Sequence, residues 1–343
     1  MSRMTRRPFA VAAGVIAASV IARRAVRISR RLDFAGTSVI ITGGSRGLGL
    51  LVARQLAGEG ARLTLAARDP DELERARREL IASGAEVDAV VCDISIPAQA
   101  LALVDHVATR TGRVDVLINN AGTMTVAPID HMEIEDFEEA MAVHFRGPLH
   151  TMLAAVPVMR RQGAGRIVNV SSIAGKIGVP HMTPYCASKF ALAGLSDSLR
   201  AELAGDGIHV TTVFPGLMRT GSPFNALFKG RHREEFAWFT IADSLPVATV
   251  DGRRAAAKLV DACRYGDAEL VIGWPARLAA LAQALAPGLV AEAAIVADRL
   301  VLPPADEASG TEGYSGWQSV SSAAPSGLTR LTNAAAIENN EIG

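Results

Sequence analysis

From Thr37 onward, short apolar runs alternate with longer stretches in which apolar residues recur every three or four positions. The short runs have the length of buried strands, and the longer stretches have the period of amphipathic helices. Strands are expected at 38–42, 62–67, 86–91, 114–119, 166–171, 209–214 and 269–272, and helices at about 47–58, 71–83, 97–111, 133–162, 184–205 and 249–265. Continuous apolar strands separated by helices predict an α/β fold with a doubly wound parallel sheet buried on both faces.

The first predicted strand ends in a glycine-rich turn, TGGSRGLG, at residues 42–49. Glycines let backbone amides approach a pyrophosphate, and the N-terminus of the following helix supplies partial positive charge. The turn therefore predicts a nucleotide site at Gly43, Ser45, Arg46, Gly47, Leu48 and Gly49. Its spacing is GxxxGxG, and glycine-rich turns between a strand and a helix also occur by chance.

Tyr185 and Lys189 lie one turn apart on a predicted helix, and Ser172 follows a predicted strand. A phenol, whose pKa is about 10, exchanges protons poorly at neutral pH unless that pKa is lowered. An ammonium group on the same helix face can lower it by favouring the phenolate. The hydroxyl of Ser172 is placed to hold a substrate oxygen beside the tyrosine. Taken alone, the pair also fits an ordinary solvated helix face.

Four motifs in this order resemble the short-chain dehydrogenase/reductase family. They are the glycine-rich turn, Asn119-Asn120-Ala121-Gly122, Ser172 with Tyr185 and Lys189, and Pro215-Gly216 with Thr220. The resemblance covers roughly residues 36–273 and implies a Rossmann-type domain that binds NAD or NADP. It also implies oxidation or reduction at an alcohol or carbonyl, and a homo-oligomer, since relatives are commonly dimers or tetramers.

The resemblance assigns a role to each site residue. Tyr185 would exchange a proton with the substrate oxygen, Lys189 would lower the tyrosine pKa and hold the nicotinamide ribose, and Ser172 would orient the carbonyl. The remaining cofactor contacts would come from Asp93 and Asn120 on the adenine side, and from Pro215 and Thr220 near the nicotinamide carboxamide. Ser171 is the competing serine, but the spacing to Tyr185 favours Ser172.

His144 is the one departure from the family pattern, which usually has Asn at this position. That Asn commonly positions a water in the proton relay behind the lysine. A histidine can donate and accept hydrogen bonds and titrates near neutrality, so one interpretation is an altered but working relay. The other is a degraded site on a catalytically weak, NADP-binding regulatory or scaffold protein. The intact Ser172, Tyr185 and Lys189 favour an enzyme.

The second predicted strand ends in Ala67-Arg68, without the acidic residue that NAD-specific relatives carry at position 67. A carboxylate there would bind the ribose 2′-hydroxyl of NAD, whereas NADP needs a cation for its 2′-phosphate. Arg46 and Arg68 could together hold such a phosphate. Surface arginines are abundant in this chain, and one of them would fit equally well as a solvated residue. The charge pattern favours NADP over NAD.

The composition excludes several other functions. The 35 basic residues equal the 35 acidic residues, which argues against a nucleic-acid-binding protein. Cys92, Cys186 and Cys263 are odd in number and widely spaced, which excludes a disulfide framework and a CxxC-type metal or redox site. No metal site is expected, and a reducing, cytoplasm-facing location fits best.

Residues 1–35 form a basic and apolar N-terminal extension. Phe9 to Ala22 is uncharged and lies between arginine clusters. As a helix it would be about 21 Å long, short of the roughly 30 Å hydrocarbon core. A signal peptide lacks a clean cleavage site here, and a transit peptide should be amphipathic, whereas a membrane anchor explains both the apolar run and its basic flanks. An ordinary extra helix stays open as the alternative. Membrane association through residues 8–31, with the catalytic domain on the cytoplasmic side, is therefore favoured over a cytoplasmic protein.

Three segments outside the motifs carry further expectations. The loop at 217–246 holds Phe224, Phe228, Phe236, Trp238 and Phe239 with Lys229, Arg231, His232 and Arg233. The aromatic residues predict an apolar lid for a hydrophobic small-molecule substrate, unless they pack on the domain or the basic cluster faces a membrane. Residues 274–304 predict two amphipathic helices that pack on the domain, with a membrane surface as the alternative. Residues 305–343 have the composition of a disordered tail.

Overall fold

The computed structural model describes residues 21–306 and 308–341, and within them a seven-stranded parallel sheet forms the centre. Its strands are β1 (Ser38–Thr42), β2 (Arg62–Ala67), β3 (Val87–Val91), β4 (Val116–Asn119), β6 (Gly165–Val170), β7 (Ile208–Pro215) and β11 (Glu269–Ile272). Their spatial order is β11-β7-β6-β4-β1-β2-β3. The predicted doubly wound parallel sheet is confirmed, and each strand lies within two residues of its expected position.

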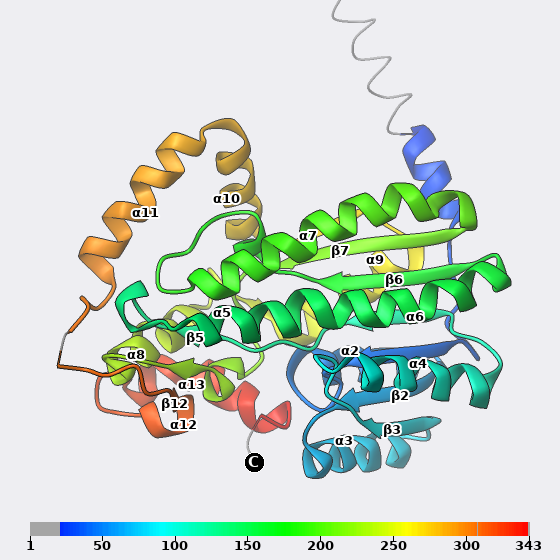
Figure 1. Ribbon diagram of the computed structural model, residues 1–343, viewed down its shortest axis with the longest axis horizontal. Helices are drawn as coiled ribbons and strands as arrows, with labels where there is room; N and C mark the ends of the chain where they lie inside the picture. The colour runs from blue at the N-terminus through cyan, green and yellow to red at the C-terminus, as the bar shows by residue number, and fades with distance from the viewer. Residues whose placement is uncertain (1–20, 307, 342–343) are drawn as a thin grey trace, which may run out of the picture.

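Helices cover both faces of the sheet (Figure 1). The helices α2 (Gly47–Gly58), α3 (Pro70–Ala82) and α9 (Gly252–Tyr265) pack on one face, and α4 (Pro97–Thr111), α6 (Gly147–Gln162) and α7 (Thr183–Leu203) pack on the other. Successive strand residues point to opposite faces. Ile41 of β1 therefore packs in the core beneath α2 and α9, while Ile40 packs in the core beneath α4 and α6.

The stretch predicted as one helix at 133–162 is interrupted. It consists of α5 (Ile134–Met141), a π-helical turn at Ala142–Arg146, and α6. A π turn inserts an extra residue into the helix and changes the direction of the side chains that follow, and such turns often occur at functional sites. Here the turn contains the buried His144.

The sheet changes winding direction at β1, which lies between β2 and β4. Because the chain leaves these neighbouring strands toward opposite faces, a crevice opens at their carboxyl ends, where ligands bind in open α/β sheets. The glycine-rich turn follows β1, and Asn120 follows β4. The fold thus brings the predicted nucleotide residues to this crevice.

Smaller elements border the crevice in the described chain. β5 (Thr125–Val126), β9 (Leu227–Phe228) and β12 (Tyr314–Ser315) form one small sheet, and β8 (Met218–Arg219) pairs with β10 (Val250–Asp251). Further elements of the described chain are α8 (His232–Ser244), α12 (Gly316–Ser319), α13 (Ser326–Glu338) and the 3₁₀ turns Ile129–His131, Ile173–Gly175 and Ser222–Asn225. Another 3₁₀ turn, Ala204–Asp206, precedes β7 and lies at the opposite, amino-terminal end of the strands.

The expectation that residues 305–343 form a disordered tail is wrong for residues 308–341, which we call the C-terminal segment. β12 adds to the edge of β9, and Trp317 stacks on Phe224 with ring centroids 4.4 Å apart. Thr332 and Ala336 of α13 are fully buried, and α13 packs on α8. Apart from Trp317, small and polar side chains provide this packing, so the composition of the segment gives no sign of it.

The predicted pair of helices at 274–304 is present as α10 (Trp274–Leu285) and α11 (Pro287–Val301). The expected packing on the domain is limited to the first turn of α10, where Ala276 is buried, and to a contact of 3.4 Å between Asp298 of α11 and Nε2 of His181. Most of both helices stands away from the rest of the described chain (Figure 1). No residue of α11 is buried by the described part of the chain. Leu285, Leu289 and Leu300 are 76%, 73% and 79% exposed.

The N-terminal part of the described chain begins with a helical stretch at residues 21–29. Arg27 anchors this stretch through ion pairs to Asp267 at 2.8 Å and Asp261 at 2.7 Å. Apart from its last two residues, the predicted apolar run Phe9–Ala22 lies outside the described residues. Among the helices of the described chain, none has both the length and the apolar character that crossing a membrane requires.

Candidate active site

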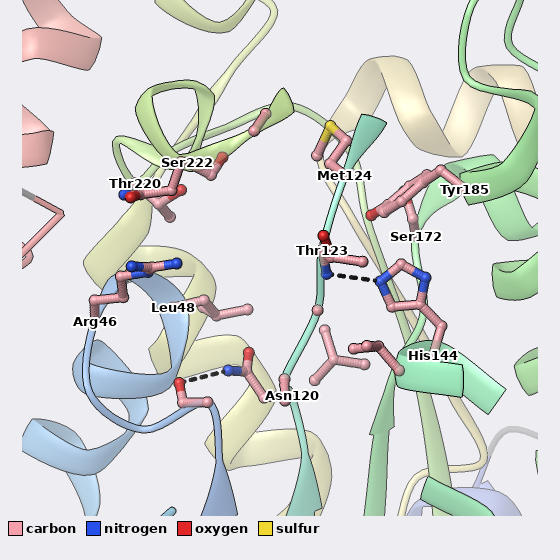
Figure 2. Close-up of a pocket in the computed structure, with 18 of the residues that line it drawn as sticks. Arg46, Leu48, Asn120, Thr123, Met124, His144, Ser172, Tyr185, Thr220 and Ser222 are labelled. Atoms are coloured by element: carbon pink, nitrogen blue, oxygen red, sulfur yellow. Dashed lines mark hydrogen bonds between the residues drawn. The ribbon is translucent and has the colours of Figure 1, made fainter. Parts of the chain in front are cut away.

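A single cleft of about 890 Å³ joins almost all of the predicted site residues. Its lining includes Gly43, Ser45, Arg46, Gly47, Leu48, Arg68, Asp93, Asn120, His144, Ser172, Tyr185, Lys189, Pro215 and Thr220. Figure 2 shows Arg46, Leu48 and Thr220 on one wall, with Ser172, Tyr185 and His144 on the wall opposite. Gly49 is the exception, because it lies behind the turn and does not line the cleft.

The glycine-rich turn keeps its shape through very close backbone contacts. Gly43 has φ +64°, and a Cβ there would lie 2.7 Å from the Cα of Ala121. A Cβ on Gly49 would overlap the carbonyl of Gly43. The side-chain amide of Asn120 donates to the carbonyls of Thr42 at 3.2 Å and Gly43 at 3.0 Å. Gly49 and Asn120 therefore position the turn, and the Asn120 amide is directed at the protein backbone.

The N-terminus of α2 and two arginines give the turn the character of an anion site. Arg46 is the N-cap residue, and its side chain does not cap the described helix. Its guanidinium pairs with Glu72 at 2.6 Å and lies 3.4 Å from Glu341. Arg68 follows β2 and lines the same end of the cleft. Backbone amides and guanidinium groups are the donors that a dinucleotide phosphate requires, so this wall fits such a cofactor, apart from the carboxylate of Glu341.

Ser172, Tyr185 and Lys189 are brought together by β6 and α7. Ser172 begins the 3₁₀ turn Ile173–Gly175, where its Oγ accepts a hydrogen bond from the amide of Ala174 at 3.2 Å. Lys189 is 4% exposed, and its Nζ donates to the carbonyl of Val170 at 2.9 Å. The same Nζ lies 5.5 Å from the centre of the Tyr185 ring. The predicted catalytic group is therefore spatially assembled.

Burial controls the protonation of this group. It raises the pKa of Tyr185 to about 12, although a hydrogen bond with Ser172 opposes the increase. It also lowers the pKa of Lys189 to about 7. The expectation that Lys189 lowers the tyrosine pKa is therefore not met in this structure, because burial disfavours the charged forms of both groups.

The two adjacent serines have different environments. Ser171 is 2% exposed, and its hydroxyl donates to the carbonyl of Lys189 at 2.9 Å. Ser172 is partly exposed to the cleft and lies beside Tyr185. Ser171 thus fixes the start of α7 against β6, and Ser172 has the geometry expected of a substrate-binding hydroxyl.

His144 is held as a neutral imidazole. Its Nε2 accepts the amide of Thr123 at 3.0 Å, and its Nδ1 lies 2.8 Å from the hydroxyl of Ser188. That hydroxyl donates to the carbonyl of Tyr185 at 2.9 Å, so the proton of the imidazole resides on Nδ1. Burial, together with the charge of Lys189, moves the pKa of His144 well below its usual range. The expectation that this histidine titrates near neutrality is therefore wrong.

The far end of the cleft is apolar. Met124, Val179, Met182, Trp238 and Phe239 line it on the side of Tyr185. The Trp238 indole donates to the buried carboxylate of Glu235 at 2.6 Å, which fixes the ring. This end of the cleft suits an uncharged substrate.

The predicted aromatic lid is only partly correct. Phe224, Phe228 and Phe236 pack together in a buried core, with ring centroids 5.5 and 5.7 Å apart for the two contacts of Phe236. Trp238 and Phe239 are the aromatic residues of the loop that line the cleft. Lys229 is buried on Asp136 at 2.6 Å, so this member of the basic cluster does not face a membrane.

Two buried acidic residues of the cleft were not anticipated from the sequence. Asp243 is 3% exposed at the end of α8, and burial raises its pKa to about 8. Glu341 is 4% exposed and reaches the glycine-rich turn from the C-terminal segment. No motif marks either residue, because their positions depend on how α8 and α13 pack.

An anion site at the switch point of the sheet faces a Ser–Tyr–Lys group across one cleft, and this arrangement is that of an NAD(P)-dependent oxidoreductase. Residues 37–226 match the family described as short chain dehydrogenase. This match covers more than half of the chain, and the chain belongs to that family.

Individual relatives agree with this classification. The chain is 38% identical to a putative ketoacyl reductase of granaticin polyketide synthase from Streptomyces violaceoruber, over 53% of this chain and 67% of the relative. It is 33% identical to 3-ketodihydrosphingosine reductase from Mus musculus, over 54% of this chain and 57% of the relative. A crystal structure of NAD⁺-bound xylitol dehydrogenase matches with a TM-score of 0.62 and 26% identity, over 71% of this chain and 99% of that one.

Proposed function

We propose that the protein is an NADP(H)-dependent reductase of a hydrophobic ketone. The observation that carries this proposal is the position of Tyr185 and Ser172 between the anion site and the apolar end of one cleft. When bound, the nicotinamide supplies or accepts the hydride. The protein has to position the carbonyl and move one proton to or from its oxygen.

Proton transfer is assigned to Tyr185. Its raised pKa keeps the phenol protonated at neutral pH, so it is suited to donate its proton to a carbonyl oxygen that becomes an alcohol. Ser172 would hydrogen-bond the same oxygen. Lys189, which follows Tyr185 by one turn, would compensate the negative charge left on the phenolate. This assignment favours reduction as the direction of the reaction.

The preference for NADP rests on Arg46 and Arg68, which line the phosphate end of the cleft where no acid ends β2. Arg68→Ala is expected to weaken NADPH binding about 10-fold and to leave NADH binding within about 2-fold, since only NADPH carries the 2′-phosphate. Fluorescence titration with both cofactors measures this. Equal losses for the two cofactors would contradict the assignment of Arg68 to the 2′-phosphate.

The hydrophobic substrate class rests on the residues at the far end of the cleft and on the relatives, two of which are named as reductases of ketoacyl and ketosphingoid compounds. A panel of ketones with increasing aliphatic chain length tests it, with consumption of NADPH as the measurement. We expect kcat/KM to rise with chain length. If wild-type protein binds NADPH and reduces none of the panel, the alternative of a regulatory or scaffold protein with this fold is favoured instead.

We also propose that the protein associates with a membrane. The apolar run Phe9–Ala22 with its arginine flanks and the exposed leucines of α10 and α11 support this. Fractionation of cells that express the protein with and without residues 1–32 tests the contribution of the N-terminal run. A full-length protein recovered in the soluble fraction would contradict the proposal.

The predicted homo-oligomer is tested by light scattering of purified protein.

A further inference from the structure

The C-terminal segment returns to the glycine-rich turn and binds it through its last described residues. The amide of Gly47, at the N-terminus of α2, donates to the carbonyl of Asn339 at 2.9 Å. The side chain of Asn340 donates to the carbonyls of Ser45 at 2.9 Å and Glu72 at 3.1 Å. Figure 1 shows α13 ending beside the nucleotide half of the sheet. These contacts join the C-terminal end of the described chain to the turn that follows the first strand of the domain.

Glu341 places a carboxylate in the anion site. One oxygen lies 2.5 Å from where a Cβ of Gly47 would be, so the carboxylate is seated against the turn itself. The other oxygen lies 3.4 Å from Nε of Arg46 and accepts a hydrogen bond from Asn225 at 2.6 Å. Arg46 is the cation proposed for the cofactor phosphate, and here a carboxylate of the same chain contacts it.

The charges around Glu341 make simultaneous occupancy by a phosphate unfavourable. Glu72 lies on the other side of Arg46, and Asp243 is buried close enough for Glu341 to raise its pKa further. Burial raises the pKa of Glu341 to about 7. Because these raised pKa values favour the neutral forms of Asp243 and Glu341, the main obstacles to a phosphate are the Glu72 carboxylate on Arg46 and the space that the Glu341 side chain occupies against Gly47. The Gly47 amide also cannot donate at full strength to Asn339 and to a phosphate.

The contacts that hold the last three residues are mainly polar, whereas those that hold the rest of the segment include aromatic stacking and buried helix packing. Asn339 and Glu341 are bound through hydrogen bonds to Thr220 and Asn225. Trp317 and the buried face of α13 attach the segment to α8 and its neighbours. Release of the last three residues therefore does not require the segment as a whole to unfold.

We propose that residues 339–341 are an autoinhibitory element that occupies the phosphate-binding part of the cofactor site, and that NADP(H) binds only when this element is displaced. The proposal rests on the proposed function, because it needs the glycine-rich turn to be the cofactor site. It predicts that binding of the cofactor and docking of the element exclude one another. The competing interpretation is a strap that closes over the bound cofactor and retains it.

NADPH affinity of variants separates these interpretations. A chain that ends at Glu338 lacks the element and is expected to bind NADPH about 10- to 100-fold more tightly, since a competent state populated at only a few per cent weakens apparent affinity by that factor. Asn340→Ala removes three hydrogen bonds, two to backbone carbonyls and one from Arg75, and it places alanine at φ 58°. It is expected to tighten binding about 5- to 30-fold. Asn333→Ala is the matched control, because Asn333 lies on α13 and, among the described residues, its side chain bonds within that helix to Thr329.

A second measurement does not depend on activity or on the variants. Hydrogen–deuterium exchange of full-length protein should show faster exchange at residues 334–341 when NADPH is added, because the cofactor displaces the element. A strap predicts slower exchange there and weaker NADPH binding by the shortened chain. Either result overturns the proposal, as does equal affinity of all variants. If no variant, including the shortened chain, binds NADPH or NADH, the proposed function fails together with the inference. If all bind equally, the proposed function remains and only the inference fails.

Discussion

Lys189 offers a test of the site that needs no substrate. Burial lowers its pKa from 10.5 to about 7, so between these values the folded protein binds fewer protons on this side chain than the unfolded chain does. The free energy of unfolding must then rise as pH rises through this window. With one pKa unit worth about 1.4 kcal/mol, the increase from about pH 7 to about pH 9 is about 2 kcal/mol.

Lys189→Met removes the titrating group and keeps an unbranched side chain in the same space. Urea unfolding of wild type and variant at the two pH values gives the stability difference between them. Other groups with shifted pKa values, such as the buried cysteines and Tyr185, titrate in both proteins and cancel in this difference. We expect the free energy of unfolding of the variant, minus that of wild type, to be about 2 kcal/mol lower at about pH 9 than at about pH 7.

The control for this experiment is Lys258→Met, which changes an exposed lysine of α9. Its stability difference from wild type should stay the same at both pH values. A Lys189→Met difference that is also independent of pH would refute the reasoning, because it would mean that burial does not hold this lysine near neutrality. The comparison requires that the m value, which is the slope of the free energy of unfolding against urea concentration, be the same for all the proteins.

Three further substitutions at His144 and Trp238 test the walls of the cleft. His144→Phe should destabilise the fold by about 1–3 kcal/mol in urea unfolding, since it leaves the amide of Thr123 without an acceptor. His144→Asn should leave the pH profile of kcat unchanged between about pH 6 and 9, because the imidazole is neutral throughout; a transition in wild type that vanishes in this variant would contradict the neutral imidazole. Trp238→Ala should raise KM for hydrophobic ketones about 10-fold with a smaller effect on kcat. The solvent-exposed Phe190 supplies the matched control, Phe190→Ala, and equal effects of both changes would argue against substrate contact by Trp238.

The sheet and the nucleotide turn could be predicted because local sequence determines them. Apolar runs such as Ser38–Thr42 have the length of a strand and are buried along all of it, as the structure shows. The glycines at 43 and 49 are needed by close backbone contacts within or next to the turn. Tyr185 and Lys189 lie on a single helix, so their spacing in sequence determines their spacing in space.

Features that depend on contacts between distant segments could not be predicted in the same way. The protonation of His144 depends on a π turn and on Thr123, and the pKa values of Tyr185 and Lys189 depend on burial by the whole domain. The C-terminal segment packs through residues such as Thr332 and Ala336, whose composition also fits a disordered chain. For α10 and α11 the sequence shows that apolar residues recur along each helix, but it does not show whether another part of the chain covers these residues.

The most direct test of the proposed function is the turnover of Tyr185→Phe with NADPH and a ketone that wild type reduces. The phenylalanine ring keeps the shape of the side chain and removes the hydroxyl that supplies the proton to the carbonyl oxygen. The predicted result is a fall in kcat of about 1000-fold or more, with NADPH affinity within about 2-fold of wild type. A variant that binds NADPH normally and reduces the ketone at the wild-type rate would contradict the assignment of Tyr185 as the proton donor.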